Sequence, residues 1–378
     1  MESSSASLQR QLRDCPYTSR MISKPHLLDL SLDQLEMQLE AAGEPTYRAR
    51  QILDWVFERQ VTAFSAMTDL PAALRERLDD TFSILGARQL AHSKAPDSTT
   101  KTLLQWPDGA TTETVMIPTE DRGSAGRGRP RRTVCLSTQV GCDVGCRFCA
   151  SGIGGSQRDL TVGEVVEQAL RVAVQLQERA ERLSHIVFMG MGEPLANYDV
   201  TVAAVRHLNA KWGLGIGQRR ITVSTVGLPT QIERLAGEEL QITLALSLHA
   251  PNDELRRDLI PWARGVPLER LVHACEIYFQ ETGREVTLEY CLLAGTNDRP
   301  EHAGQLAAIA KRLRAHVNLL MYNPVESLPF DRPTDFQAHD FLAALRRQGV
   351  NAHLRRSRGL EADAACGQLR RRQSLRRG

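Results

Sequence analysis

Three of the chain's eight cysteines, Cys142, Cys146 and Cys149, fall within eight residues. At this C-x3-C-x2-C spacing, three thiolates on one short loop can hold three corners of a cubane iron-sulfur cluster. The fourth iron then has no nearby protein ligand and can bind a small chelating molecule. The alternative is zinc, but structural zinc takes four ligands, usually from paired C-x2-C units, and the sequence contains no second pair. The spacing therefore favours a [4Fe-4S] cluster.

A glycine-rich turn at residues 190–194 follows a strand-like run. Its glycines allow a ligand to approach the backbone closely, and the carboxylate of Glu193 can accept hydrogen bonds from an ammonium group. Each of four other polar residues, taken singly, fits a hydrogen-bonded strand end better than a ligand. These residues are Ser224, Ser247, His249 and Asn323.

The composition is that of a globular chain, with 378 residues, 42% apolar and 24% charged. The N-terminus has no apolar segment typical of export, and no uncharged stretch approaches the roughly 20 residues of a membrane span. Eight sparse cysteines indicate metal binding in a reducing cytosol rather than disulfides. We therefore expect a soluble cytoplasmic protein that binds no membrane.

The net charge of +2 hides an asymmetry, because residues 346–378 contain ten arginines against Glu361 and Asp363. Residues 122–132 add five arginines and no acid. Two interpretations stay open on charge alone: an anionic partner, nucleic acid first, or a solvated tail.

Hydrophobic periodicity divides the chain into five segments. Residues 1–25 are polar and expected to be disordered, and residues 26–95 carry three helical patterns, the first opened by Ser31. In residues 96–132, apolar and polar residues alternate as in a β-hairpin, and the segment ends in the basic loop. Over residues 133–356, six strands alternate with six amphipathic helices, which predicts an α/β fold with a parallel sheet curled into a full or partial barrel. Residues 357–378 form a basic C-terminal extension.

The first of these helices should begin at Thr161, because Thr161 and Glu164 have the capping-box spacing. The cysteine loop then lies directly before it. Sites in such barrels form at the C-terminal ends of the strands. We expect the strands at 133–137, 185–190, 220–225, 242–248, 285–293 and 316–322, and the helices at 161–183, 199–212, 229–236, 267–281, 300–315 and 334–348.

Cys366 lies between small residues in the basic C-terminal segment, which we expect to lower its pKa and make it reactive. Cys135 stands seven residues before Cys142 and is either functional or a small buried residue. The remaining thiols are interpreted as a terminal thiol and two core residues: Cys15, Cys275 and Cys291.

Together, the three-cysteine loop and the segment around Cys366 resemble the RlmN/Cfr family of radical-SAM RNA methyltransferases. Further motifs extend the resemblance over nearly the whole chain, at 45–52, 67–71, 113–118, 135–142, 190–194 and 247–251. Two segments depart from the family pattern: an arginine-rich stretch between Pro118 and Cys135, and the tail at 370–378. Neither contains a catalytic motif.

The resemblance implies a radical-SAM partial (β/α)6 barrel with a small N-terminal helical domain that binds RNA. It implies that Cys142, Cys146 and Cys149 hold the [4Fe-4S] cluster and that S-adenosylmethionine (SAM) occupies its open iron. The implied SAM contacts are Gly192, Glu193, Ser224, Ser247, Leu248, His249 and Asn323.

Adenine C2 is an electron-poor carbon, so a simple methyl transfer lacks a nucleophile and a radical route is needed. In the chemistry that the resemblance implies, one SAM methylates Cys366, and a second yields a 5'-deoxyadenosyl radical that takes a hydrogen atom from that methyl group. The methylene radical adds to the base. Glu113 then accepts the ring proton, and Cys135 attacks Cys366 and releases the product through a transient disulfide.

The implied substrates are adenosine 2503 of 23S rRNA and adenosine 37 of tRNA. The implied enzyme is a monomer that takes electrons from a flavodoxin-like reductant. Two alternatives stay open. The C8-methylating branch of the family shares all these motifs, and a non-catalytic RNA-binding protein could use the cysteines for structural zinc.

Overall fold

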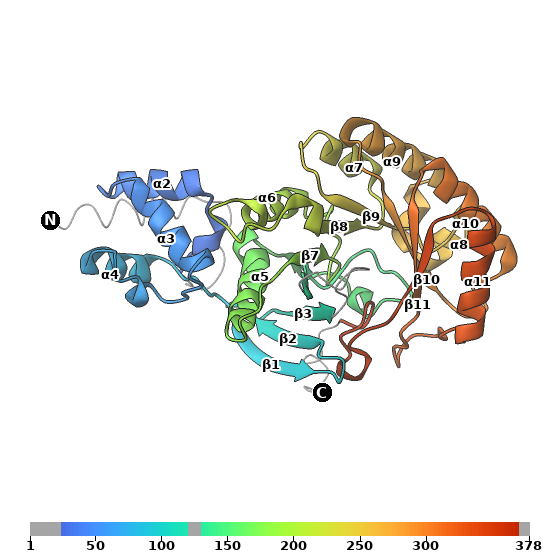
Figure 1. Ribbon diagram of the computed structural model, residues 1–378, viewed down its shortest axis with the longest axis horizontal. Helices are drawn as coiled ribbons and strands as arrows, with labels where there is room; N and C mark the ends of the chain where they lie inside the picture. The colour runs from blue at the N-terminus through green and yellow to red at the C-terminus, as the bar shows by residue number, and fades with distance from the viewer. Residues whose placement is uncertain (1–23, 120–129, 370–378) are drawn as a thin grey trace.

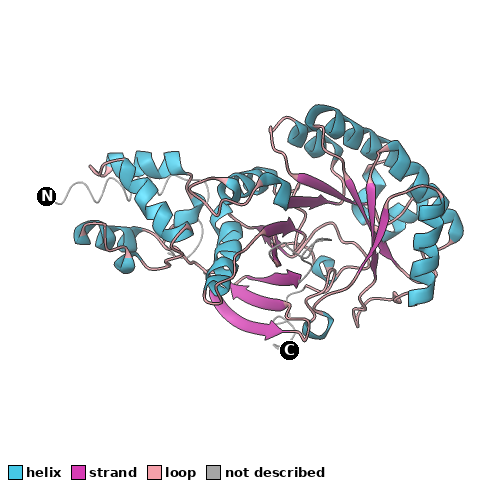
Figure 2. Cartoon of the chain, in the orientation of Figure 1, coloured by secondary structure: helices cyan, strands magenta, loops and turns pink. Residues whose placement is uncertain are grey.

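The computed structural model describes residues 24–119 and 130–369 (Figure 1). A small helical lobe stands beside a larger α/β region built on one curved sheet (Figure 2). Nearly all of the expected disordered N-terminus, most of the basic loop at 122–132 and the tail at 370–378 lie outside the described residues. Within the described ranges, no helix is long and apolar enough to cross a membrane.

The lobe contains the three helices expected from the sequence. The capping box at Ser31 is formed, because its hydroxyl accepts a hydrogen bond from Gln34 N while the Gln34 side chain accepts one from Ser31 N. Apolar residues at helical spacing are buried between the helices. The elements are η1 (Leu27–Asp29), α2 (Leu32–Ala41), α3 (Tyr47–Phe57), η2 (Phe64–Ala66) and α4 (Ala72–Thr81).

One ten-stranded sheet, in the order β1-β2-β3-β4-β7-β8-β9-β10-β11-β12, forms the larger region. From β4 to β12 neighbouring strands are parallel, and β1, β2 and β3 extend the β4 edge as antiparallel strands. The six expected parallel strands are β4 (Arg131–Cys135), β7 (His185–Phe188), β8 (Ile221–Thr225), β9 (Thr243–Ser247), β10 (Thr287–Leu292) and β11 (His316–Met321). The expected hairpin is β2 (Thr100–Gln105) and β3 (Thr111–Thr119).

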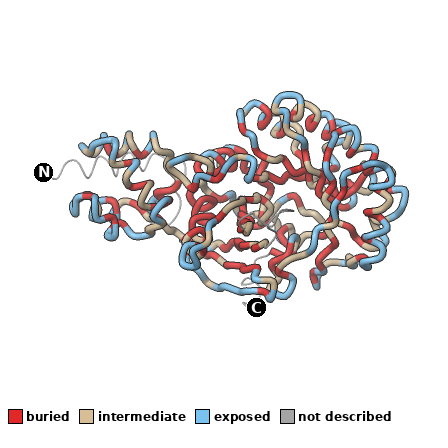
Figure 3. Tube along the Cα trace, in the orientation of Figure 1, coloured by how far each residue is buried: buried red, intermediate tan, exposed pale blue. Residues whose placement is uncertain are grey.

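The six expected helices connect these strands and cover the convex side of the sheet (Figure 1). Buried residues concentrate between helices and sheet (Figure 3). Thr161 and Glu164 form the predicted capping box. The helices are α5 (Val162–Gln177), α6 (Tyr198–Asn209), α7 (Pro229–Ala236), α9 (Leu268–Thr282), α10 (Pro300–Arg312) and α11 (Asp335–Arg347).

Besides several 3-10 turns and the two-residue strands β5 (Gln139–Val140) and β6 (Arg158–Asp159), three elements were not expected. Residues 88–94, placed by the sequence analysis at the end of the helical domain, form strand β1 (Arg88–Lys94), which is mostly exposed and therefore lacks a one-sided apolar pattern. Helix α8 (Asp253–Leu259) has only seven residues, too few to display a helical period, and the Asn252 side chain caps it. Strand β12 (Ala352–Arg355) has four residues and adds to the sheet beside β11.

Glu167 of α5 joins the lobe to the barrel. Its buried carboxylate lies 2.7 Å from Nε2 of His26 and accepts hydrogen bonds from Gly86 N and Ala87 N at 2.7 and 3.1 Å and from Arg171 Nε at 2.7 Å. Burial alone would raise the pKa of Glu167, but the hydrogen bond from His26 and the charges of His26 and Arg171 hold it below its ordinary value. The carboxylate is therefore ionised and fixes the lobe against α5.

Candidate active site

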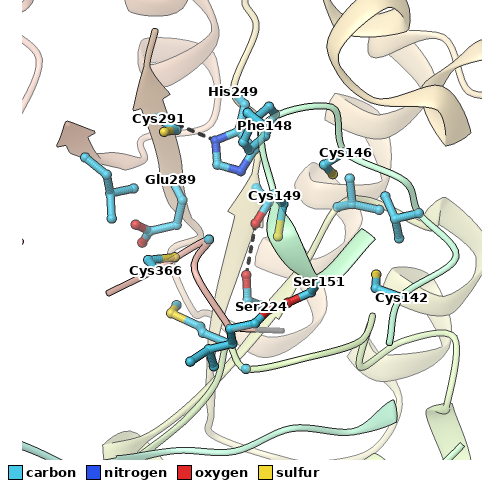
Figure 4. A pocket seen from close by; sticks show the side chains of 18 of the residues that line it. Cys142, Cys146, Phe148, Cys149, Ser151, Ser224, His249, Glu289, Cys291 and Cys366 are labelled. Atoms are coloured by element: carbon cyan, nitrogen blue, oxygen red, sulfur yellow. Dashed lines mark hydrogen bonds between the residues drawn. The ribbon is translucent and has the colours of Figure 1, made fainter. Parts of the chain in front are cut away.

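A pocket opens at the C-terminal ends of the parallel strands, where it receives side chains from the cysteine loop, from the ends of β7, β8, β9, β10 and β11, and from the C-terminal segment (Figure 4). It brings together most of the residues that the sequence analysis singled out. They are Cys142, Cys146, Cys149, Gly192, Glu193, Ser224, Ser247, His249, Asn323 and Cys366.

The cysteine loop is held open toward the pocket by local hydrogen bonds. Cys149 N donates to the carbonyl of Cys146 at 3.0 Å, and Gly145 takes a left-handed conformation with φ of 67°. The Asp143 carboxylate accepts a hydrogen bond from Ser156 N at 2.6 Å. All three thiols are partly buried and line the pocket.

These thiols fit an iron-sulfur cluster. They are soft donors on one pocket wall, and burial raises the pKa of Cys142 to about 12, so that only a bound metal would keep it deprotonated. Among the described residues, no group of three or more His, Cys, Asp or Glu side chains is arranged to hold a single metal ion. A cubane carries its protein ligands on separate irons and does not require such convergence.

The turn after β7 needs its glycines. A Cβ on Gly190 would lie 2.7 Å from the carbonyl oxygen of Leu136, and one on Gly192, whose φ is 101°, would lie 2.6 Å from Gln139 Cβ. The turn therefore packs directly on the loop that follows β4. This packing brings Glu193 into the pocket wall.

Glu193 is buried, and its two carboxylate oxygens accept hydrogen bonds from the backbone N of Leu195 and Val226, at 3.0 and 2.8 Å. Burial raises the pKa of Glu193 to about 7, although these hydrogen bonds lower it. Such a carboxylate has a strong tendency to bind a cation, because a positive ligand would compensate its desolvation.

His249 is held neutral in the pocket. Burial lowers the pKa of His249 to about 3, and its Nδ1 accepts a hydrogen bond from Cys291 N at 3.0 Å. The ring proton is therefore on Nε2. The rings of His249 and Phe148 meet edge to face, with their centroids 4.9 Å apart (Figure 4). The hydroxyl oxygens of Ser224 and Ser247, which also line the pocket, are 3.0 Å apart.

Leu248 differs from its neighbours among the expected SAM contacts. Its side chain is fully buried in the main apolar core and does not line the pocket. Its backbone N donates to the carbonyls of Leu246 and Glu289.

The C-terminal segment places Cys366 against the cysteine loop. Ala150 N donates to the carbonyl of Gly367 at 2.8 Å, and Ser151 Oγ donates to that of Leu369 at 2.8 Å. Asn323 Nδ2 donates to the carbonyl of Cys366 at 3.1 Å. The first two donors belong to the turn η3 (Ala150–Gly152) directly after Cys149, so the two segments are attached to each other.

The expectation of a lowered pKa for Cys366 is wrong. The thiol is solvent-accessible yet surrounded by the pocket walls, and this burial, with the charges of Cys149 and Glu289, raises its pKa to about 12. The arginines of the segment are not the dominant influence, because the thiol faces the pocket rather than the basic surface. Cys366 is thus a neutral thiol in the absence of ligands.

Glu113 and Cys135 lie on one face of the sheet beside this pocket. In the register, Val115 pairs with Cys135 on β4, and Glu113 is two residues before Val115, so the three side chains point to the same side. Cys135 packs in an apolar cluster with Ala364 and Leu369, which flank Cys366 in the chain. Burial and the charge of Cys366 raise the pKa of Cys135 to about 12.

Among the pocket residues that sequence reasoning missed are Glu289 and Cys291 of β10. The interpretation of Cys291 as a core residue is wrong, because it lines the pocket, whereas Cys275 is fully buried as expected. The alternation of a strand could have found both, since 289 and 291 share one face while Leu288 and Tyr290 point to the core. Cys15 lies outside the described residues.

Two family models match this chain. The model of the Radical SAM superfamily matches residues 136–307, and that of the ribosomal RNA large subunit methyltransferase N-terminal domain matches residues 25–84. A relative from Rhodopirellula baltica, named "Probable dual-specificity RNA methyltransferase RlmN", is 47% identical over 348 residues, which are 92% of this chain and 91% of the relative. The chain belongs to the RlmN family.

A second relative and a solved structure support the same family. A protein of the same name from Thermosynechococcus vestitus is 46% identical over 350 residues, covering 92% of this chain and 99% of its own. A solved radical SAM methyltransferase from Sphaerobacter thermophilus has a TM-score of 0.87 and 45% identity, with 92% of this chain and 99% of that chain covered.

RlmN membership confirms the resemblance and the partial radical-SAM barrel with its small N-terminal helical domain. The chain is a radical-SAM methyltransferase, and membership of the superfamily implies a [4Fe-4S] cluster and SAM. The non-catalytic zinc-binding alternative is therefore set aside.

Proposed function

We propose that this RlmN enzyme methylates C2 of an adenine in 23S rRNA and in tRNA. The observation that carries the proposal is the attachment of the Cys366 segment to the cysteine loop, through Ala150 N and Ser151 Oγ. A thiol that receives a methyl group and later loses a hydrogen atom from it must stand beside the bound SAM. This attachment supports that placement for Cys366.

Cys142, Cys146 and Cys149, which line the pocket, would hold the cluster. When bound, the cluster and SAM supply a methyl group and one-electron chemistry. Glu193 would accept hydrogen bonds from the ammonium group of SAM. Its raised pKa falls when a cation binds, which favours the ionised carboxylate.

The neutral His249 can donate through Nε2 without adding a positive charge to a site for the sulfonium ion of SAM. The hydroxyls of Ser224 and Ser247 provide further donors and acceptors at the strand ends. The Asn323 side chain would keep the Cys366 backbone in position.

The remaining steps fall to Cys366, Glu113 and Cys135. Cys366 carries the methyl carbon as a thioether, and after loss of one hydrogen atom that carbon bonds to C2. Glu113 takes the C2 proton, and the unpaired electron of the adduct passes to a one-electron acceptor, which the cluster would provide. The Cys135 thiolate then attacks the Cys366 sulfur, an S–S bond forms as the S–C bond breaks, and the carbon takes the electron pair and a proton to complete the methyl group. An external thiol reductant reopens the disulfide before the next cycle.

RNA binding would involve the helical lobe, whose family model is that of a ribosomal RNA methyltransferase domain. Arg50 in α3 and Arg59 just after it are exposed and suit contacts to phosphate. The guanidinium carbon of Arg59 lies over the Trp55 ring, 4.0 Å from its centroid. We further propose a cytoplasmic monomer that takes single electrons from a flavodoxin-like reductant.

Mass spectrometry of the product nucleoside tests the proposal. The anaerobically purified, brown enzyme should convert 23S rRNA fragments and tRNA to 2-methyladenosine when given SAM and reductant. Formation of 8-methyladenosine would instead assign the chain to the C8-methylating branch. A loaded enzyme that methylates neither RNA would overturn the proposal.

A further inference from the structure

Arg256 of α8 is among the most deeply buried side chains of the chain, with 1% of its surface exposed. Its Nη2 donates to the carbonyl of Val226. Its Nε and Nη1 are buried and have no hydrogen-bond partner within the described part of the chain. A buried, incompletely paired guanidinium is strongly unfavourable unless a negative charge compensates it. The fold therefore keeps a cation at a position where burial destabilises it.

Helix α8 packs behind the cysteine loop. Arg147 N, in the loop, donates to the carbonyl of Leu259 at the end of α8 at 3.0 Å. Leu259 also shares an apolar cluster with Val144 and Phe148, against which the three loop cysteines pack. Arg256 is not among the residues that line the pocket, so it approaches the loop from the protein side rather than from the SAM side.

The groups that face Arg256 identify its charge partner. Burial lowers the pKa of Arg256 to about 10, and the largest opposing effect comes from the charge of Cys146, followed by Asp253 and Cys275. Asp253 is already engaged, because its carboxylate accepts a hydrogen bond from Leu268 N at 2.8 Å. Arg256 thus lies close enough to Cys146, a proposed cluster ligand, for the charge of each to act on the other.

We propose that Arg256 is a positioning residue that acts through the cluster, as a buried countercation that raises its reduction potential. This inference rests on the proposed function, since it requires a [4Fe-4S] cluster on the three thiols. Reduction adds one electron to a group that three thiolates already make negative. A cation in a low-dielectric interior stabilises the reduced form more than the oxidised form, so the cluster accepts the electron more readily.

Redox titration of the reconstituted cluster tests this role without measuring methylation. The reduced fraction is followed by electron paramagnetic resonance while a low-potential mediator sets the solution potential. Arg256→Gln should lower the ratio of reduced to oxidised cluster about tenfold at a given potential, which is a shift of about 59 mV to more negative values. Arg256→Lys retains the charge and should stay close to the wild type.

Two further variants keep the test decisive. Arg256→Met also removes the charge but fills a similar volume with apolar atoms, a replacement that buried ion sites often tolerate, so it substitutes for Arg256→Gln if that variant does not fold. Arg257→Gln removes a charge from the next position of α8, where the side chain is 50% exposed, and should shift the potential little because solvent screens it.

The outcomes separate the inference from the proposed function. A wild-type protein that binds no iron-sulfur cluster would refute the proposed function itself. A loaded cluster whose midpoint potential is the same in the wild type and in the folded neutral variant would refute the role of Arg256 alone. Equal shifts for Arg256→Gln and Arg257→Gln would also refute it, because burial would then be irrelevant.

Discussion

Lys101 Nζ lies 3.0 Å from Oε1 of Glu113, and both side chains are buried. The two residues stand on the neighbouring antiparallel strands β2 and β3. The same ammonium group donates a hydrogen bond at 2.9 Å to the carbonyl of Asp363, three residues before Cys366. One lysine therefore links the proposed proton acceptor to the segment that carries the proposed methyl carrier.

Lys101→Met should shift the pH dependence of methylation and destabilise the fold. A buried carboxylate that loses a neighbouring cation holds its proton more tightly, so Glu113 would ionise at higher pH than in the wild type and the acidic limb of the pH–rate profile would move upward. Removal of one partner of a buried ion pair costs about 3–5 kcal/mol. Single-turnover rates across pH and denaturant unfolding measure both effects.

Lys101→Arg is the control, because it retains the charge and should keep the acidic limb near its wild-type position. An unchanged profile in Lys101→Met, in protein that remains folded, would show that Lys101 does not act on the base.

The parallel barrel was predictable because each strand and helix of the β/α units carries its own apolar pattern. The capping boxes at Ser31 and Thr161 were also predictable, since they depend on residues three apart. Strand β1 was not, because its exposed residues gain order only from hydrogen bonds to β2.

The residues of the site likewise divide into those that local spacing predicts and those that only the fold brings together. Spacing along the chain identified the cysteine loop, but the raised pKa of Cys366 depends on pocket walls that come from distant segments. Lys101 and Arg256 lie 262 and 110 residues from Asp363 and Cys146 respectively, and nothing local marks either as a partner. Contacts of this kind follow from the fold and not from a motif.

Glu167→Gln should destabilise the junction between lobe and barrel in a pH-dependent way. The folded pKa of Glu167 is held below its ordinary value of 4.5, so its contribution to stability is present above about pH 4.5 and is lost as pH falls through the folded pKa. The variant should lose about 3–5 kcal/mol at pH 7, because His26 and Arg171 lose their carboxylate. Denaturant unfolding at several pH values measures the difference.

That difference should shrink as the pH is lowered through the folded pKa. Glu233→Gln is the control, because Glu233 pairs with Arg270 on the surface, where solvent screens the charges, and its loss should change stability little at any pH. A difference for Glu167→Gln that does not change with pH would contradict the proposed ion pairing.

Replacing any one of Cys142, Cys146 or Cys149 with Ala should remove the cluster and all methylation, because two thiolates cannot retain a cubane in a solvent-accessible pocket. The fold should persist, which circular dichroism would show. Iron content and visible absorbance report the cluster. Cys275→Ala is the matched control: its thiol is buried in the core, and the variant should bind iron as the wild type does.

Cys366→Ala should keep the cluster and SAM binding but lose methyl transfer, because no protein thiol remains to carry the carbon. Peptide mass spectrometry of the wild type should find the methyl group on Cys366. Cys291→Ala is the control: it removes the pocket thiol that has no proposed role, and the variant should still be methylated on Cys366. Full activity of Cys366→Ala would refute the two-stage mechanism.

Cys135→Ala distinguishes product release from the earlier steps. Cys135 packs against Ala364 and Leu369, on either side of Cys366, which places it near the Cys366 sulfur. In the proposed sequence it attacks that sulfur after the carbon has bonded to the base. The variant should therefore complete every earlier step and stop with RNA joined to Cys366 through a methylene group. It should purify with RNA that survives denaturation and that nuclease digestion shortens to a small adduct on the peptide containing Cys366.

The double variant Cys135→Ala with Cys366→Ala should carry no RNA, because the attachment requires the Cys366 sulfur. Normal turnover of the single variant would make Cys135 a packing residue of β4, in keeping with its 8% exposure. Loss of activity without an adduct would place its role before carbon–carbon bond formation. An intermediate accumulates when the step that consumes it is removed. An RNA adduct that accumulates in Cys135→Ala and requires Cys366 is therefore the one outcome that agrees with Cys135 acting in the last step.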